Sequence, residues 1–205
     1  MPSPIAKLTG SAQAELFHDL NYLNMAEIKA FCKKHSIPYT IWIETKDGRR
    51  KRTHEQDRKG VILNRIRHFL ETGFVLEETC FPSSVVSSEG PSVPLKPEDR
   101  LYYGRYDKHD ALMTSLLKKL TEGKFKNGAI ARILAREFWT KGEAPTFKQF
   151  AAAWMRETRD HTRPNPEWAF LSDIANKTAG SNWKRIRLQK AQRVLKILDE
   201  LFNYY

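Results

Sequence analysis

Four consecutive cations, Arg49, Arg50, Lys51 and Arg52, lie within the stretch TKDGRRKRTHE at residues 45–55. Guanidinium and ammonium groups bind phosphate oxygens through charge-assisted hydrogen bonds, and each phosphate they neutralise releases counterions, so that affinity depends on salt. The run therefore predicts a phosphate-binding loop. The alternative is structural, because cations also protect the exposed edge of a β-sheet from pairing with another chain.

Further cations lie in two predicted helices that flank this run. Asn24 followed by Glu27 is a capping-box pattern that begins the first helix, and Pro38 lies beyond its end. The second helix is predicted from about residue 56 to a stop at Gly73. Their basic residues are Lys29, Lys33 and Lys34 in the first helix and Arg58, Lys59 and Arg65 in the second. We expect this set to form one basic surface with Arg49 to Arg52.

The segment between the two helices is predicted to be extended. Residues 39–45, YTIWIET, are rich in β-branched and aromatic residues, and Ile41 and Ile43 alternate with Trp42 and other side chains. Asp47-Gly48 is a hairpin turn signal. The cations then fall on the returning strand or its loop.

The order helix, extended segment, helix resembles the SAP family, in the longer form known from bacterial and fungal proteins. The resemblance covers residues 16–73, from an aromatic stretch at Phe17 to Tyr22 through LNYLNMAEIKAFCKKHSIP to RKGVILNRIRHFL. The matching positions are Leu23, Met25, Glu27, Ile28, Lys29, Ile37, Pro38, Lys59, Ile62, Leu63, Arg65 and Ile66. The resemblance implies non-enzymatic binding of DNA. Residues 39–56 depart from it, because the family's short loop is replaced by a strand and the cation run.

Three segments are expected along the chain. Residues 1–80 form the SAP-like nucleic-acid-binding module, and residues 81–99, with four prolines and five serines, form a linker. Residues 100–205 form an α-helical domain with helices near 107–121, 128–140, 146–160, 167–178 and 182–203. The fold class is therefore mainly α: a helix, extended segment, helix module with an inserted basic β-hairpin, followed by a C-terminal helical bundle. Residues after 100, with RLYYGRY and GEAPTFKQFAAAW, resemble an uncharacterised companion domain of such modules.

The last predicted helix is amphipathic. Its apolar side carries Ile186, Ala191, Val194, Leu195, Leu198 and Leu201, and its other side carries Arg185, Arg193 and Lys196. We expect the apolar side to pack onto the C-terminal bundle.

The composition favours an anionic partner. Lys and Arg number 35 against 24 Asp and Glu, a net charge of +11 with a pI near 9.7. Residues 1–75 carry a net +5, residues 76–99 a net −4 and residues 100–205 a net +10. Two cysteines are too few for a disulfide framework, and neither a signal peptide nor a membrane span is expected. We expect a cytoplasmic, nucleoid-associated or nuclear protein.

Catalytic motifs are absent from the sequence. The six histidines have no HExxH or paired-ligand spacing, and there is no phosphate loop or nucleophile elbow. We expect no catalytic residue, no metal and no cofactor, and a protein that binds nucleic acid, DNA rather than RNA, through phosphates with weak sequence preference. Two alternatives stand. The first is a protein-interaction adaptor whose partner docks on the C-terminal helices and whose basic module recruits it to nucleic acid or to an acidic partner. The second is a nucleic-acid-processing enzyme built from dispersed carboxylates.

Overall fold

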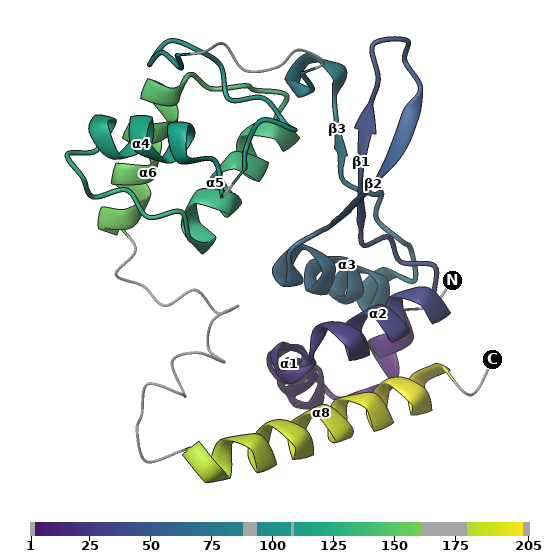
Figure 1. The fold of residues 1–205 in the computed structure, drawn as a ribbon. Helices are drawn as coiled ribbons and strands as arrows, with labels where there is room; N and C mark the ends of the chain where they lie inside the picture. The colour runs from purple at the N-terminus through teal and green to yellow at the C-terminus, as the bar shows by residue number, and fades with distance from the viewer. Residues whose placement is uncertain (1–2, 88–93, 108, 161–179, 203–205) are drawn as a thin grey trace. The chain divides into compact units, whose positions relative to one another are not determined.

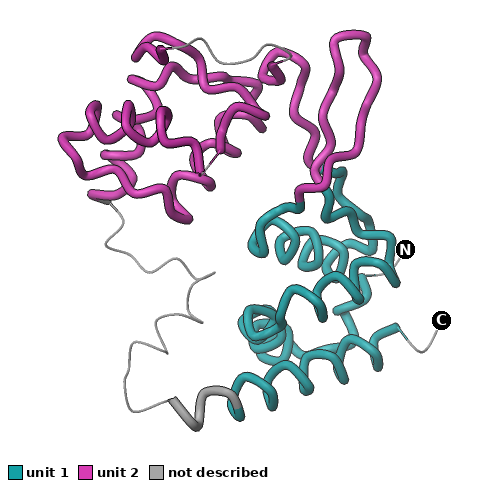
Figure 2. The backbone as a smooth tube through the Cα atoms, in the orientation of Figure 1, with its two compact units in different colours: residues 1–40, 56–78, 164–205 teal, residues 41–55, 79–163 magenta. Residues whose placement is uncertain are grey.

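The chain is described by a computed structural model that covers residues 3–87, 94–107, 109–160 and 180–202 (Figure 1). It is mainly α-helical with a small sheet, as predicted. The chain forms two compact units that are discontinuous in sequence (Figure 2). Unit 1 comprises residues 1–40, 56–78 and 164–205, and unit 2 comprises residues 41–55 and 79–163. This division differs from the predicted one, which separated residues 1–80 from residues 100–205.

Unit 1 is a helical unit. Its α-helices are α1 (Gly10–Asp19), α2 (Met25–Lys34), α3 (Lys59–Thr72) and α8 (Gly180–Phe202). The predicted capping box begins α2: Glu27 N donates to Asn24 Oδ1 at 2.9 Å, and Asn24 N donates to Glu27 Oε2 at 2.7 Å. Gly73 ends α3 in the left-handed conformation, with φ of 76°. Helix α1 was not predicted.

Helix α8 packs in unit 1, which corrects the prediction that it would pack onto the C-terminal bundle. Its Ala191, Val194, Leu198 and Leu201 are buried in the same core as residues of α1, α2 and α3. The rest of that core is Ile5, Leu16, Leu20, Leu23, Ile28, Phe31, Cys32, Ile37, Ile62, Leu63, Ile66 and Leu70. The apolar side of α8 was predicted correctly, but an apolar stripe on a helix does not specify which other surface of the protein it packs against.

Unit 2 contains the sheet. Strands β1 (Thr40–Glu44), β2 (Arg50–Gln56) and β3 (Cys80–Phe81) lie in the order β2-β1-β3, and β3 runs parallel to β1. Strand β3 was not predicted, because it lies at the start of the segment assigned as a linker. Phe81 and Val85 are fully buried there, so these two residues are part of the core of unit 2 despite their Pro- and Ser-rich surroundings.

The helices of unit 2 lie close to their predicted positions. They are α4 (Ala111–Leu120), α5 (Ala129–Thr140) and α6 (Phe147–Asp160). Thr146 and Gln149 cap α6 reciprocally, at 3.1 and 2.9 Å. The core is built from Ile41, Phe81, Val85, Leu101, Met113, Leu117, Phe125, Ala131, Ala135, Trp139, Ala144, Phe147, Phe150, Ala151 and Trp154. The helix predicted over residues 167–178 lies outside the described residues.

Candidate nucleic-acid interface

The predicted hairpin is present, and its turn is held by local hydrogen bonds. Thr45 N donates to Arg49 O at 2.8 Å, and Gly48 N donates to Thr45 O at 2.9 Å. Gly48 has φ of 76°, a conformation in which a side chain would be strained. The Asp47-Gly48 turn signal therefore sets where the returning strand begins.

Arg49 is engaged inside this turn. Its Nε donates to Asp47 Oδ2 at 2.5 Å, and its Nη2 forms an ion pair with the same carboxylate. A hydrogen bond from the Thr45 hydroxyl, followed by the bond from Arg49, lowers the pKa of Asp47 below its usual value. The carboxylate therefore stays ionised and offsets the charge of Arg49.

The next three cations lie on strand β2. Arg50, Lys51 and Arg52 are all exposed, and β2 is an edge strand of the described sheet. Because side chains alternate along a strand, Arg50 and Arg52 share one face and Lys51 lies on the other. Residues 45–55 carry five Lys and Arg residues against two carboxylates, a net charge of +3. The ribbon thus presents positive charge from both faces.

Strand β2 is anchored at its far end. Thr53 Oγ1 donates to Ile41 O at 2.7 Å, and Glu55 pairs with Arg136 of α5 at 2.7 Å. Strand β3 pairs only with Trp42 and Ile43 of β1. Beyond Ile43, β1 continues only to Glu44, so the part of the hairpin beyond the pairing with β3 is short: it comprises Glu44, the turn and the start of β2.

Arg65 does not belong to an exposed basic surface, contrary to the prediction. It is 5% exposed and pairs with the buried Asp57 at 2.6 Å. It also donates to Pro38 O at 3.1 Å and to Glu77 O at 3.0 Å. Its role is to join the segments on either side of α3, because a buried guanidinium needs a carboxylate and further acceptors.

The other predicted cations of unit 1 have mixed surroundings. Lys59 Nζ donates to Asn21 O at 2.5 Å, and Lys34 pairs with Asp199 of α8 at 3.2 Å. Lys33 is exposed and Lys29 is half-buried, while Arg58 is the half-buried N-cap residue of α3. Lys33 and Lys34 lie in the last turn of α2, where cations favourably oppose the helix dipole.

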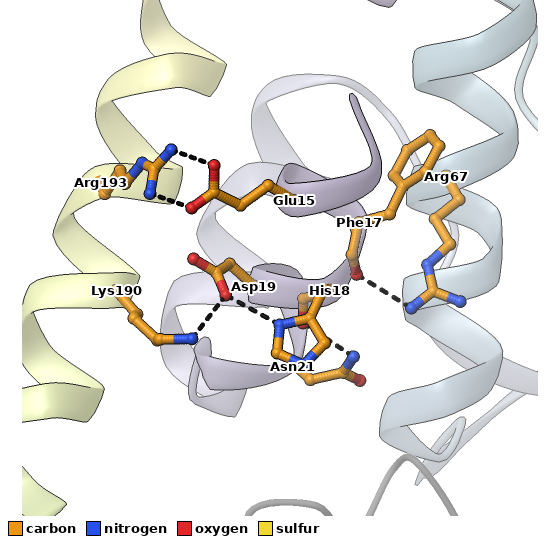
Figure 3. A network of polar contacts seen from close by, with 8 residues as sticks. All are labelled: Glu15, Phe17, His18, Asp19, Asn21, Arg67, Lys190 and Arg193. Atoms are coloured by element: carbon orange, nitrogen blue, oxygen red, sulfur yellow. Dashed lines mark hydrogen bonds and ion pairs between the residues drawn. The ribbon is translucent and has the colours of Figure 1, made fainter. Parts of the chain in front are cut away.

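Helix α8 contributes cations that sequence reasoning did not connect with their partners (Figure 3). Lys190 pairs at 3.0 Å with Asp19, which is 2% exposed, and Arg193 forms a two-pronged pair with Glu15. Arg187 likewise pairs with Glu27. Partial burial of Lys190 opposes its ionisation, but its bonds to Asp19 outweigh that effect and raise its pKa. These pairs join α8 to α1 and α2.

The predicted basic residues therefore fall into two sets. Arg49 to Arg52 belong to unit 2, whereas the helical set of Lys29, Lys33, Lys34, Arg58, Lys59 and Arg65 belongs to unit 1. The four hairpin cations lie close to one another, because they are consecutive residues of the turn and of β2. Sequence reasoning also missed three arginines, Arg100, Arg156 and Arg159, that line a cleft of unit 2. The spacing of Arg156 and Arg159, three residues apart on a helix, was the available signal.

The described part of the chain gives little indication of a metal site or of a reactive cysteine. No group of three or more His, Cys, Asp or Glu side chains that could hold a metal ion is found there. Both cysteines are free thiols, and burial raises the pKa of Cys32 to about 11, so that it is protonated at neutral pH. None of the described helices combines the length and the hydropathy that crossing a membrane requires.

Comparison with known proteins finds no family that matches this chain, no similar curated protein and no similar solved structure.

Proposed function

We propose that the protein binds DNA without catalysing a reaction, and that the β1–β2 hairpin is its main contact with the phosphate backbone. The observation that carries the proposal is the exposure of Arg50, Lys51 and Arg52 together on an edge strand. Arginine offers a planar fork that matches phosphate oxygens, and lysine adds a compact charge.

The form of the hairpin supports DNA rather than RNA as the ligand. The major groove of B-form DNA admits a two-stranded β-ribbon, whereas the major groove of an RNA helix is deep and narrow. The β1–β2 hairpin is a pair of strands of this kind, and β3 joins the other edge of β1 at Trp42 and Ile43. Because its exposed charges suit phosphates, the expected binding is sensitive to salt and has weak sequence preference.

Unit 1 contributes less to DNA binding in this proposal. The helices α2 and α3 of this unit belong to the helix, extended segment, helix order that resembles the SAP family, but Arg65, one of the matching positions, is buried against Asp57. Lys29, Lys33 and Arg58, which are exposed or half-buried, form a secondary contact. The hairpin replaces the short loop of the family as the principal grip.

The test is a charge reversal on the hairpin. The triple variant Arg50→Glu/Lys51→Glu/Arg52→Glu should reduce affinity for duplex DNA by at least about a hundredfold at low salt, since it replaces three phosphate contacts with repulsion. Fluorescence anisotropy with a labelled duplex measures the loss, and circular dichroism checks that the fold is retained.

A matched control reverses three other exposed lysines of the same unit. Lys118→Glu/Lys126→Glu/Lys148→Glu changes the net charge by the same amount at positions outside the hairpin. It should reduce affinity far less than the hairpin variant. Equal losses in the two variants would mean that only net charge matters, and an unaffected hairpin variant would leave β2 as a charged sheet edge with no role in binding.

A further inference from the structure

Unit 2 contains a cleft of about 900 Å³ that is separate from the hairpin cations. Its walls are the end of α5, the turn that follows it, one face of α6, and the segments around Ser84 and Arg100. The volume lies within the range of sites for small molecules and cofactors. No residue of the cation run lines it.

One face of α6 supplies much of the lining. Gln149, Ala152, Ala153, Arg156 and Arg159 recur at intervals of three or four residues, which places them along one side of the helix. The two alanines leave space in the middle of this face. Arg156 and Arg159 are exposed, and among the described residues neither has a hydrogen-bond or ion-pair partner.

A third guanidinium faces the cleft from the opposite segment. Arg100 lines it and is held by a hydrogen bond from Nη1 to Ala144 O at 2.8 Å. One such bond leaves most of the five donors of an arginine available. Among the described residues of the lining, Glu143 is the single carboxylate, so the three arginines give this part of the cleft a net positive charge of two.

The cleft also has aromatic walls. Tyr102 and Phe138 line it and are half-buried, and the Arg105 guanidinium lies over the Tyr102 ring, 5.5 Å from its centre. Aromatic rings stack on planar heterocycles, and guanidinium forks bind phosphate oxygens. The cleft therefore combines aromatic rings, guanidinium groups and the two small residues Ala152 and Ala153.

We infer that this cleft binds a nucleotide unit, with its base against Tyr102 and Phe138 and its phosphate on Arg156, Arg159 and Arg100. The bases of a duplex are stacked and paired, so the unit is unpaired. Two sources share this chemistry: a free mononucleotide, and an unpaired nucleotide of a single strand. The inference is independent of the DNA-binding proposal, because the cleft and the hairpin use different residues.

The test uses the full chain and defined probes. Isothermal titration compares AMP, adenosine and inorganic phosphate, and fluorescence anisotropy follows a labelled single-stranded oligonucleotide. If the free nucleotide is the ligand, AMP should bind at least about tenfold more tightly than adenosine or phosphate, since only AMP satisfies both the rings and the arginines. If a strand is the source, the single strand binds and AMP does not.

Two variants locate the binding. Arg156→Glu/Arg159→Glu reverses the charge of α6 toward the cleft, and Ala152→Trp fills the cleft without altering charge. Each should weaken the bound probe at least about tenfold. Lys148→Glu is the matched control, because it is an exposed cation of the same helix that does not line the cleft, and it should leave binding unchanged.

The outcomes separate this inference from the hairpin proposal. Duplex binding should survive Ala152→Trp, whereas the hairpin variant should retain AMP or single-strand binding in the cleft. Inorganic phosphate binding as tightly as AMP would overturn the assignment of a nucleotide. So would a failure of both AMP and the single strand to bind, or binding that Ala152→Trp and Arg156→Glu/Arg159→Glu leave intact.

Discussion

The two units differ in what surrounds their Lys and Arg side chains. Unit 1 has 15 Lys and Arg residues against 11 carboxylates and unit 2 has 20 against 13, so both are basic. In unit 1, Lys190 and Arg193 hold helices together through carboxylates from distant parts of the sequence, and Arg65 pairs with the buried Asp57 eight residues before it. In unit 2, Arg50 to Arg52 and the cleft arginines are exposed. Net charge therefore does not show which cations are available to a ligand.

The difference follows from where carboxylates lie in three dimensions. Helix α8 carries its cations toward Glu15, Asp19 and Glu27, and each of these carboxylates precedes its partner cation by at least 160 positions. In the hairpin, Asp47 bonds with the turn residues Thr45 and Arg49, while Arg50, Lys51 and Arg52 are exposed on β2. Charge pairs that join elements stabilise a fold, whereas charges on a projecting edge are suited to a partner.

The largest expected effect comes from breaking the buried pair of unit 1. Arg65→Ala leaves Asp57 buried without its partner, and the loss of stability should be about 3–5 kcal/mol. Urea denaturation followed by helical circular dichroism measures it. Arg156→Ala, which removes an exposed arginine, is the control and should change stability little. A loss below about 1 kcal/mol for Arg65→Ala would mean that the pair is not buried as described.

A pair of single charge reversals compares the units directly in DNA binding. Lys51→Glu, on the hairpin, should weaken duplex binding by about tenfold at low salt, because a phosphate contact becomes a repulsion. Lys34→Glu carries the same charge change in unit 1, where Lys34 already pairs with Asp199. Its effect should be clearly smaller. Anisotropy titrations measure the duplex affinity of both variants. A larger loss of affinity for Lys34→Glu would mean that the main DNA contact lies on the helices of unit 1.

A smaller effect is expected from pH in unit 1. His35 packs against Phe31, Phe69 and Phe202, and burial, then the charge of Lys34, lowers its pKa below 6.5, while Asp199 opposes the shift. The folded state therefore favours the neutral ring. This contribution to stability is fully present above pH 6.5 and is lost as the pH falls from there through the folded-state pKa.

Thermal unfolding between about pH 7.5 and about pH 5 tests this expectation. His35→Phe keeps an aromatic ring without a titratable group, so its melting temperature should fall less over that range than that of the parent. His54, an exposed histidine of the hairpin, provides the control substitution His54→Phe. If both variants follow the parent, His35 does not contribute to the pH dependence.

Local signals in the sequence predicted much of the secondary structure. The capping box at Asn24, the turn at Gly48 and the stop at Gly73 each act over a few residues, and all lie where they were expected. Helix α1 was missed because its start depends on a single N-cap, Thr9. Strand β3 was missed because two residues carry no periodicity, and its pairing with β1 is set by tertiary structure.

The candidate site was predicted less completely than the fold. The hairpin cations could be found because they are consecutive and follow a turn signal. Arg65 was misassigned because helical spacing alone does not reveal that Asp57, eight residues earlier, lies buried beside it. The cleft was missed because Arg100 and the α6 arginines come together only when the segment before α4 packs against α6.

The most direct test of the contrast between the units is the salt dependence of duplex binding. The neutral variant Arg50→Gln/Lys51→Gln/Arg52→Gln removes up to three phosphate contacts, so the slope of log K against log salt should become shallower by about two to three. The matched variant Lys29→Gln/Lys33→Gln/Lys34→Gln in unit 1 should change the slope by less than about one. Equal slopes for the parent and the hairpin variant would contradict the assignment of the hairpin as the phosphate contact.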